Sequence, residues 1–356
     1  MVRELKVSSD RKYSVFVDTA WVSHLKEFSA DRQKVGFIVS SPMKDRISSL
    51  GTTAGEMHIF EIPDGEAGKS ADVLFQLWNK LNVAGFSRGD LLVGVGGGAV
   101  TDLTGFLAAT WLRGIDWVAV PTTLAGMVDA SVGGKTGINT ELGKNLVGAF
   151  HSPIAVLIDL QWLTTLSDRD FGAGLAEVIK CGFISDQEIL NSMDGLGISE
   201  IRENHSLTRS LIERAVAVKA DVVSSDFKEG ALREILNYGH TFGHAIEIYS
   251  HYQLRHGEAV SIGMVFIAEI SAARGLISAD LLNRHRAILS KVGLPIVLPA
   301  IFTVESLPDL VVSMSRDKKV KAGKIRFVAL HEGSEIIRLD DVNDAELAAA
   351  YGKVLS

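Results

Sequence analysis

The chain has 356 residues, 47% of them hydrophobic, and a formal net charge of −7 at pH 7. This length allows two domains of ordinary size, and the acidic balance argues against a protein that binds nucleic-acid backbones. Cys181 is the only cysteine, which excludes a disulfide within the chain. A charged first segment and the lack of any apolar run of about 18 residues predict a cytoplasmic protein that does not enter membranes.

Short runs of β-branched and apolar residues mark the first half of the chain as a parallel sheet. Buried strands are predicted at 35–39, 91–95, 117–120 and 155–159, and a helix at 70–82. Strands that alternate with helices indicate a mostly parallel sheet covered on both faces. We therefore predict an α/β, Rossmann-like domain over residues 1–160.

Helical spacing of apolar residues dominates the second half. Helices are predicted at 171–184, 206–224, 231–249, 257–275 and 278–292. A run at 324–330 is predicted to form a strand of a small hairpin. The second domain, residues 161–356, is therefore expected to be mainly α-helical.

A glycine-rich turn follows the strand predicted at 91–95. Gly94, Gly96, Gly97 and Gly98 precede a predicted helix start, where backbone amides and the helix N-terminus favour a phosphate. The alternative is a tight turn without a ligand. Asp102 has two interpretations as well, because a carboxylate in the first turn either stabilises the helix dipole or binds a substrate hydroxyl.

A second glycine-rich stretch, residues 129–145, is basic. Gly133-Gly134-Lys135-Thr136 resembles the end of a P-loop, but Val128 occupies the position of the required earlier glycine. ATP hydrolysis by that motif is therefore excluded. An anion or polyol site and a solvated basic turn both remain possible interpretations.

Four of the ten histidines fall between residues 240 and 256. In a continuous helix, Arg233, Asn237, His240 and His244 would share one face. A pair of histidines four residues apart, followed by a third after a loop, predicts a transition-metal site. The alternative for any single histidine is a buried core residue.

Glu177 and Lys180 lie one turn apart among apolar neighbours. They predict either an ordinary helical ion pair or a metal ligand beside a cation that binds phosphate or carboxylate. The spacing leaves both interpretations open, and the same holds for Lys219.

Six blocks of the sequence, taken together and in order, resemble the 3-dehydroquinate synthase family. They include Gly96-Gly97-Gly98 and the segment Gly239-His240-Thr241-x-Gly243-His244. The full set is 96–106, 121–145, 176–180, 236–247, 256–260 and 316–319.

The resemblance implies an activity with two cofactors. It implies an NAD-dependent lyase that also needs a divalent metal, zinc or cobalt. The substrate would be the sugar phosphate 3-deoxy-D-arabino-heptulosonate 7-phosphate, and the products 3-dehydroquinate and phosphate, in the shikimate pathway to aromatic amino acids. The implied course is transient oxidation, phosphate elimination, re-reduction and intramolecular aldol closure.

The resemblance also implies roles for individual residues. It pairs His240 with His256 and Glu177 as metal ligands, and thereby frees His244 to contact substrate. The NAD contacts that it implies are Asp64, Gly65, Glu66, Lys69, Gly98, Ala99, Val100, Thr101, Asp102, Thr122, Thr123, Lys135, Lys144, Trp162, Leu163, Thr164 and Thr165. The substrate contacts are Asp102, Lys135, Asn145, Lys180, Lys219, Arg233, Asn237, His244, Lys318 and Lys319. Arg113 would reach the phosphate site of the neighbouring subunit in a homodimer.

Three other functions compete with this one. Another sugar phosphate cyclase would use the same cofactors on a different heptulose or hexose phosphate. A metal-dependent polyol dehydrogenase would release NADH in stoichiometric amounts. A non-catalytic binding protein would have little physical reason to keep so many charged residues in a buried site.

Overall fold

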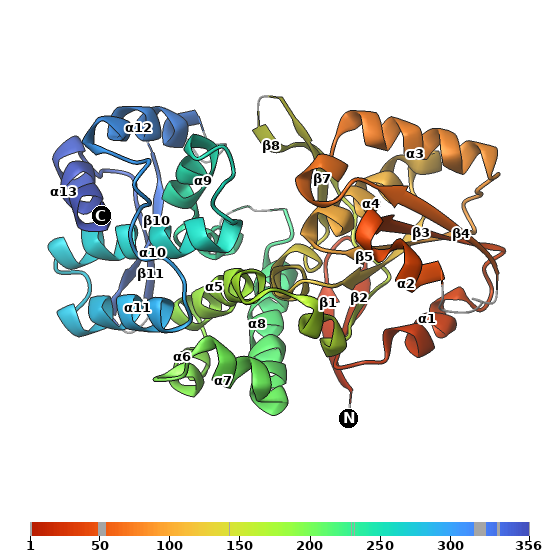
Figure 1. Cartoon of the computed structure of the whole chain (residues 1–356), viewed down its shortest axis with the longest axis horizontal. Helices are drawn as coiled ribbons and strands as arrows, with labels where there is room; N and C mark the ends of the chain where they lie inside the picture. The colour runs from red at the N-terminus through yellow and green to blue at the C-terminus, as the bar shows by residue number, and fades with distance from the viewer. Residues whose placement is uncertain are drawn as a thin grey trace. The chain divides into compact units, whose positions relative to one another are not determined.

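The computed structural model describes residues 2–48, 55–141, 143–228, 230, 232–316, 325–332 and 335–355. The chain forms two compact units (Figure 1). The first consists of Met1–Leu166 and Lys219–Lys228, and the second of Ser167–Val218 and Glu229–Ser356. Helix α8 (His205–Ser225) contributes residues to both units.

A seven-stranded sheet forms the centre of the first unit, in the order β1-β2-β9-β6-β5-β3-β4. Only β1 runs antiparallel to its neighbour, and the other adjacent pairs are parallel. All four predicted strands are confirmed. The fully buried apolar runs of β5 and β9 are typical of strands in a parallel sheet that is covered on both faces. The strands are β1 (Arg3–Ser8), β2 (Lys12–Val17), β3 (Lys34–Ser40), β4 (Glu56–Ile62), β5 (Leu91–Gly96), β6 (Asp116–Pro121) and β9 (Ala155–Ile158).

Helices and one hairpin complete the first unit. Ser70 caps α3 by accepting a hydrogen bond from the Val73 amide, which explains where the predicted helix begins. The helices are α1 (Trp21–Ser29), α2 (Lys44–Ser48), α3 (Ala71–Val83) and α4 (Gly98–Thr110). The short helices are η1 (Ser41–Met43), η2 (Gly65–Gly68), η3 (Trp111–Arg113), the π-helix η4 (Gly126–Ala130) and η5 (Leu160–Thr165). The hairpin consists of β7 (Lys135–Thr140) and β8 (Gly143–Phe150).

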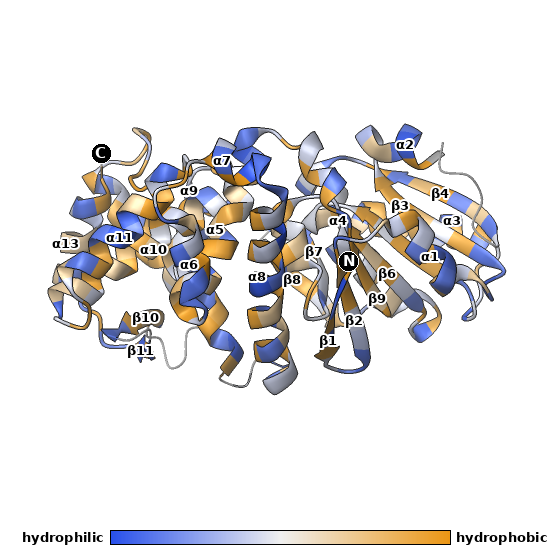
Figure 2. Cartoon of the chain, turned by 90° about the horizontal axis from the view of Figure 1, so that it is seen from below, coloured by the Kyte–Doolittle hydropathy of each residue, from blue (hydrophilic) through white to orange (hydrophobic). Residues whose placement is uncertain are grey.

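The second unit is built around helix α10 (His256–Ala273). This helix is almost entirely buried and hydrophobic (Figure 2) and packs against α5, α9, α11 and α13. The other elements are α5 (Asp168–Ile184), α6 (Gln187–Met193), α7 (Ile198–Glu203), η6 (Leu232–Asn237), α9 (His240–Tyr249), α11 (Ala279–Lys291), η7 (Val304–Ser306), α12 (Leu307–Arg316) and α13 (Asp344–Val354). The predicted hairpin is confirmed as β10 (Phe327–His331) with β11 (Glu335–Leu339). Within the described residues, we find no helix with the length and hydropathy that a bilayer crossing requires.

The helix predicted at 231–249 is broken in the middle, so that part of the prediction is wrong. The 3₁₀-helix η6 ends at Asn237, and α9 begins only at His240. Between them Gly239 has a φ of 78°, a left-handed conformation that interrupts an α-helix. Arg233 and Asn237 therefore do not share a helical face with His240 and His244.

Candidate active site

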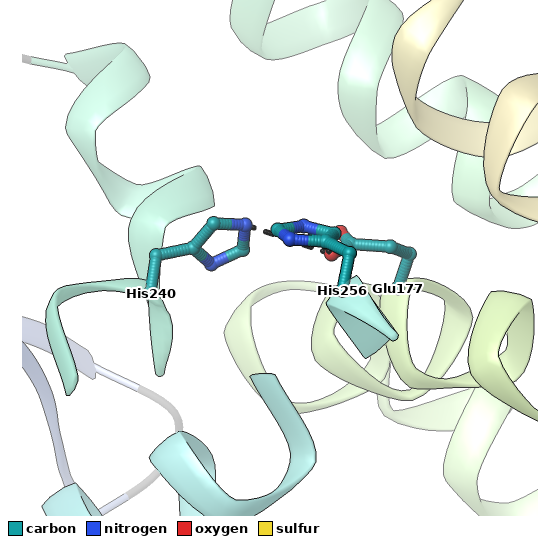
Figure 3. A group of neighbouring side chains, drawn as sticks. All are labelled: Glu177, His240 and His256. Atoms are coloured by element: carbon teal, nitrogen blue, oxygen red, sulfur yellow. Dashed lines mark ion pairs between the residues drawn. The ribbon is translucent and has the colours of Figure 1, made fainter. Parts of the chain in front are cut away.

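Three residues from three helices of the second unit converge on one point (Figure 3). Glu177 lies within α5, while His240 and His256 are the first residues of α9 and α10. Glu177 Oε1 is 3.5 Å from His240 Nε2 and 3.3 Å from His256 Nε2. These are the three residues that the sequence resemblance implies as metal ligands.

The spacing of these donor atoms fits a small divalent cation. Two ligands that each lie about 2.1 Å from a tetrahedral ion are about 3.4 Å apart, close to the separations measured here. One carboxylate and two imidazoles form a donor set that suits zinc or cobalt. Three protein ligands leave a fourth position for a substrate oxygen.

Glu177 is kept ionised in a buried position. Burial alone would raise the pKa of its carboxyl group, but Lys180 and His256 outweigh this effect and lower the pKa well below its usual range. Lys180, one turn along α5, forms an ion pair with Oε2, so Oε1 faces the two histidines. The ion pair and the ligand role that the sequence left as alternatives are therefore compatible.

The two histidines are oriented by other groups. His256 Nδ1 lies 3.1 Å from Glu247 Oε2, and His240 Nδ1 lies 3.1 Å from the Tyr238 carbonyl oxygen. Contacts of this kind fix which ring nitrogen faces the metal. Burial lowers the pKa of His256, but Glu247 and Glu177 outweigh it and raise this pKa to about 10.

His244 lies beside the three proposed ligands. Its ring centroid is 5.3 Å from that of His240 and 5.8 Å from that of His256. Donor atoms of His244, Glu247 and His256 also lie within 4.8 Å of one another. Because Glu247 faces the far nitrogen of His256, it is better suited to orient that ring than to bind the same ion.

The other predicted substrate residues of the second unit have different surroundings. The short helix η6 carries Arg233, which is almost fully buried, and Asn237, which is partly exposed. Lys318 and Lys319 lie outside the described residues.

The glycine turn of the first unit lies at the carboxyl edge of the sheet, where ligands of such folds bind. Gly96 ends β5, and the backbone amide of Thr122, just after β6, donates to its carbonyl over 2.9 Å. A Cβ on Gly96 would lie 2.5 Å from Val100. The turn therefore needs glycine for packing, while the N-terminus of α4 remains available for a phosphate. The segment of Trp162 to Thr165 follows β9 at the same edge.

Lys69 and Asp102 link the segment 64–69 to α4 through an ion pair. Burial raises the pKa of Asp102, against the lowering effect of Lys69. Asn139 of the hairpin extends this contact, because its amide donates to Glu66 Oε2 over 2.6 Å. The side-chain oxygen Oδ1 of Asn139 accepts from the Asn145 backbone amide over 3.1 Å. Predicted nucleotide and substrate residues are thus joined in one network within the first unit.

Two predicted residues of the first unit have unusual backbone conformations, and two others lie at solvent-accessible positions. Asn145 and Arg113 have positive φ angles of 56° and 67°. Non-glycine residues keep such angles only where the surrounding structure holds the backbone in place. Lys135 is exposed and Lys144 half-exposed on the β7–β8 hairpin.

Two residues of these contacts were not predicted as site residues from the sequence. Asp129, in the π-helix η4, forms an ion pair with Lys219, whose ammonium also donates to the Asp129 carbonyl oxygen over 2.7 Å. Glu247 orients His256. A π-helix leaves no periodic signal, although a helical projection from His240 would have placed Glu247 two turns along α9.

Comparison with known proteins identifies the family of the chain. The models of the 3-dehydroquinate synthase N-terminal and C-terminal families match residues 59–173 and 174–320. A 3-dehydroquinate synthase of Corynebacterium diphtheriae is 45% identical, with 98% of each chain covered. One of Thermobifida fusca is 48% identical over 96% of this chain and 93% of its own.

One solved structure has a similar fold over nearly the whole chain. The 2-epi-5-epi-valiolone synthase of Streptomyces hygroscopicus, with NAD+ and Zn2+ bound, superposes with a TM-score of 0.88 and 26% identity, with 99% of each chain covered. The family models match residues 59 to 320, and the two 3-dehydroquinate synthases named above are at least 45% identical over nearly the full length. The chain therefore belongs to the 3-dehydroquinate synthase family.

Proposed function

We infer that this chain has the activity of its family. It converts 3-deoxy-D-arabino-heptulosonate 7-phosphate to 3-dehydroquinate and phosphate. The observation that carries this proposal is the convergence of Glu177, His240 and His256. The Glu177 Oε1 atom lies 3.3 Å and 3.5 Å from the two histidine Nε2 atoms. The relatives of the chain are named 3-dehydroquinate synthase.

The proposed cofactors are NAD and one zinc or cobalt ion. The similar cyclase structure contains NAD+ and Zn2+, and the ligand set described above suits that ion. When bound, NAD would supply reversible hydride transfer with C5 of the sugar, and a metal held by Glu177, His240 and His256 would lower the pKa of the C5 hydroxyl. The hydride is returned, so the net reaction is a phosphate elimination with ring closure and no net oxidation.

The second unit supplies the charges and the proton transfers. Glu177, held ionised, and the two histidines bind the metal. Buried Lys180 and Arg233 balance the negative charge of a substrate carboxylate or phosphate. His244 moves a proton at a substrate oxygen, since an imidazole titrates near neutral pH. Asn237 orients a hydroxyl.

The first unit binds the nucleotide and orients substrate hydroxyls. The backbone amides at the start of α4 bind the pyrophosphate, with Asp64 to Lys69, Thr122, Thr123, Lys144 and Trp162 to Thr165 around it. Asp102 and Asn145 orient hydroxyls, while Lys135 and Lys219 add positive charge. We place Lys318 and Lys319 among the substrate contacts as well, on the resemblance alone.

Assembly and location complete the proposal. Arg113 is proposed to act in the phosphate site of the neighbouring subunit of a homodimer. The cytoplasm is the proposed compartment, because a single buried cysteine, Cys181, suits a reducing environment.

The decisive test follows three products of one reaction. Purified, metal-loaded protein is incubated with NAD and the heptulosonate phosphate, and phosphate, dehydroquinate and NADH are measured together. We expect equal amounts of phosphate and dehydroquinate without net NADH. Accumulation of NADH would instead assign a polyol dehydrogenase, and turnover of a different sugar phosphate alone would assign another cyclase.

A further inference from the structure

A buried hydrogen bond joins Tyr238 to His285, away from the residues assigned to substrate and metal. Both side chains are fully buried. The Tyr238 hydroxyl lies 2.8 Å from His285 Nε2, and His285 Nδ1 lies 2.7 Å from the Leu281 carbonyl oxygen. The imidazole also stacks on Phe183 of α5, with ring centroids 3.6 Å apart and planes 6° from parallel. His285 is therefore held on several sides by α11 and α5.

The contacts of His285 define its tautomer. A carbonyl oxygen only accepts hydrogen bonds, so Nδ1 carries the proton that is donated to Leu281. Nε2 is left as an acceptor, and the Tyr238 hydroxyl must be its donor. Burial lowers the pKa of His285 to about 4, which is consistent with a neutral ring at physiological pH.

Tyr238 connects this pair to a proposed metal ligand. It lies between the end of η6 at Asn237 and the left-handed Gly239, where the backbone belongs to no regular element. Its carbonyl oxygen is 3.1 Å from His240 Nδ1, so His240 donates from Nδ1 and presents Nε2 to Glu177. The side chain of Tyr238 thus anchors the peptide whose carbonyl sets the orientation of His240.

We propose that Tyr238 and His285 are positioning residues for the metal ligand His240. The hydrogen bond from the Tyr238 hydroxyl to α11 fixes the Tyr238 carbonyl, and that carbonyl fixes the tautomer and rotation of the His240 ring. This proposal rests on the proposed metal site. It goes beyond that site, because neither side chain is among the residues assigned to metal or substrate.

The test uses the cobalt-loaded protein, with cobalt affinity from chelator competition and the visible cobalt absorption spectrum as readouts. Tyr238→Phe removes only the hydroxyl. We expect its dissociation constant for cobalt to rise by up to about 10-fold, the low end of the effect of disturbing an outer-shell partner, because the Tyr238 carbonyl itself is retained, and we expect its spectrum to change. Tyr351→Phe is the matched control, because Tyr351 is equally buried in this unit and its hydroxyl donates to the Thr303 carbonyl oxygen over 2.8 Å.

Two substitutions of His285 separate positioning from packing. Glutamine can accept from Tyr238 and donate to Leu281, so His285→Gln should keep most of the cobalt affinity. His285→Leu offers no acceptor to the Tyr238 hydroxyl, and it should lose as much cobalt affinity as Tyr238→Phe. The double variant Tyr238→Phe/His285→Leu should lose little more than either single variant, because the two residues act through one bond.

The outcomes distinguish the two proposals. If Tyr238→Phe and Tyr351→Phe lose stability alike but keep the cobalt affinity and spectrum of the unchanged protein, the pair serves only packing and the positioning role is refuted. If the unchanged protein itself binds no cobalt, the proposed metal site fails first.

Discussion

At the scale of single residues, each proposed metal ligand is controlled by a group that does not bind the metal. Lys180 pairs with one oxygen of Glu177, Glu247 faces His256, and the Tyr238 carbonyl faces His240. These contacts orient the ligand atoms towards one another, which reduces the cost of ordering them when a metal binds.

Replacing His240 by alanine tests the metal site directly. We expect His240→Ala to retain almost no zinc or cobalt after dialysis and to lose turnover, because two donors cannot hold the ion as three do. Metal content is measured by atomic emission. The matched control is His205→Ala, which removes an exposed histidine at the start of α8 and should leave both quantities unchanged. Full metal content in His240→Ala would refute the assignment.

His285 should make the stability of the metal-free protein depend on pH. Its pKa is lowered from 6.5 to about 4, first by burial and then by the charge of Arg284, against the opposing hydrogen bond to Leu281. The unfolded chain binds the proton more readily, so folding is weakened as pH falls from 6.5 towards 4. The effect is on the order of 3 kcal/mol across that window.

The measurement compares the unchanged protein with His285→Gln in urea at several pH values. The difference in free energy of unfolding between them should shrink as pH falls from 6.5 to 4. A constant difference would mean that His285 does not titrate in this window. All five tryptophans lie in the first unit and His285 in the second, so circular dichroism is a better probe than tryptophan fluorescence.

The sequence indicated which residue types form the site, but not how they meet. The charged pair Glu177–Lys180 was visible because it interrupts an apolar helix. Helical spacing favoured a pair of His240 with His244 and did not indicate the pair of His240 with His256. The latter pair depends on the break in the helix at Gly239 and on two helices whose first residues meet. Both features arise from packing against α10, which the spacing of residues does not reveal. Only the family resemblance named His256.

At the scale of elements, glycines allow the helices of the second unit to approach closely enough for this meeting. A Cβ on Gly257 would lie 1.8 Å from the Ala173 carbonyl oxygen of α5, and one on Gly263 would lie 1.9 Å from the Gly239 carbonyl oxygen. Both positions therefore require hydrogen in place of a side chain. The first contact sets the separation of α5 and α10, and with it the distance from Glu177 to His256.

Adding one methyl group at this crossing should damage both stability and metal binding. We expect Gly257→Ala to lose about 1–3 kcal/mol of stability through overpacking and to bind cobalt more weakly, because α10 must move away from α5. The control is Gly352→Ala in α13, where nothing lies within 4 Å of the new Cβ and alanine should raise stability by roughly 0.5–1 kcal/mol. Thermal unfolding and cobalt titration of both variants check this, and unchanged cobalt affinity in Gly257→Ala would contradict it.

The elements that were predicted are those whose burial leaves a local pattern. The interior strands β3, β5, β6 and β9 are short apolar runs, and α3 has a capping serine. The hairpin β7–β8 was not predicted, because most side chains of β8 are exposed and show no alternation of buried and exposed positions. Its glycines and lysines suggested a binding loop instead.

At the scale of the whole molecule, the proposed role of Arg113 is testable by mixing subunits. Arg113→Ala and Glu177→Gln should each be inactive alone. If the arginine acts in the neighbouring site, random mixing makes half of the dimers hybrid, each with one complete site, and activity returns to about a quarter of the unchanged protein. The two variants are unfolded together, refolded and assayed for phosphate release. Absence of any recovery, with hybrid dimers confirmed by differential tagging, would place Arg113 in its own subunit's site, whereas full activity of Arg113→Ala alone would place it outside catalysis.

The path of the chain between the two units has a consequence for synthesis. The first unit is completed by residues 219–228, where Ser224 accepts a hydrogen bond from the Ser8 amide over 3.0 Å and Phe227 stacks edge-on against Phe150. A ribosome therefore exposes the whole sheet, and then residues 167–218 of the other unit, before the last piece of the first unit emerges. During that interval Asp129 has no Lys219 with which to form its ion pair. The nascent amino-terminal half therefore cannot reach its finished form by itself. A fragment that stops at residue 166 would be incomplete in the same way.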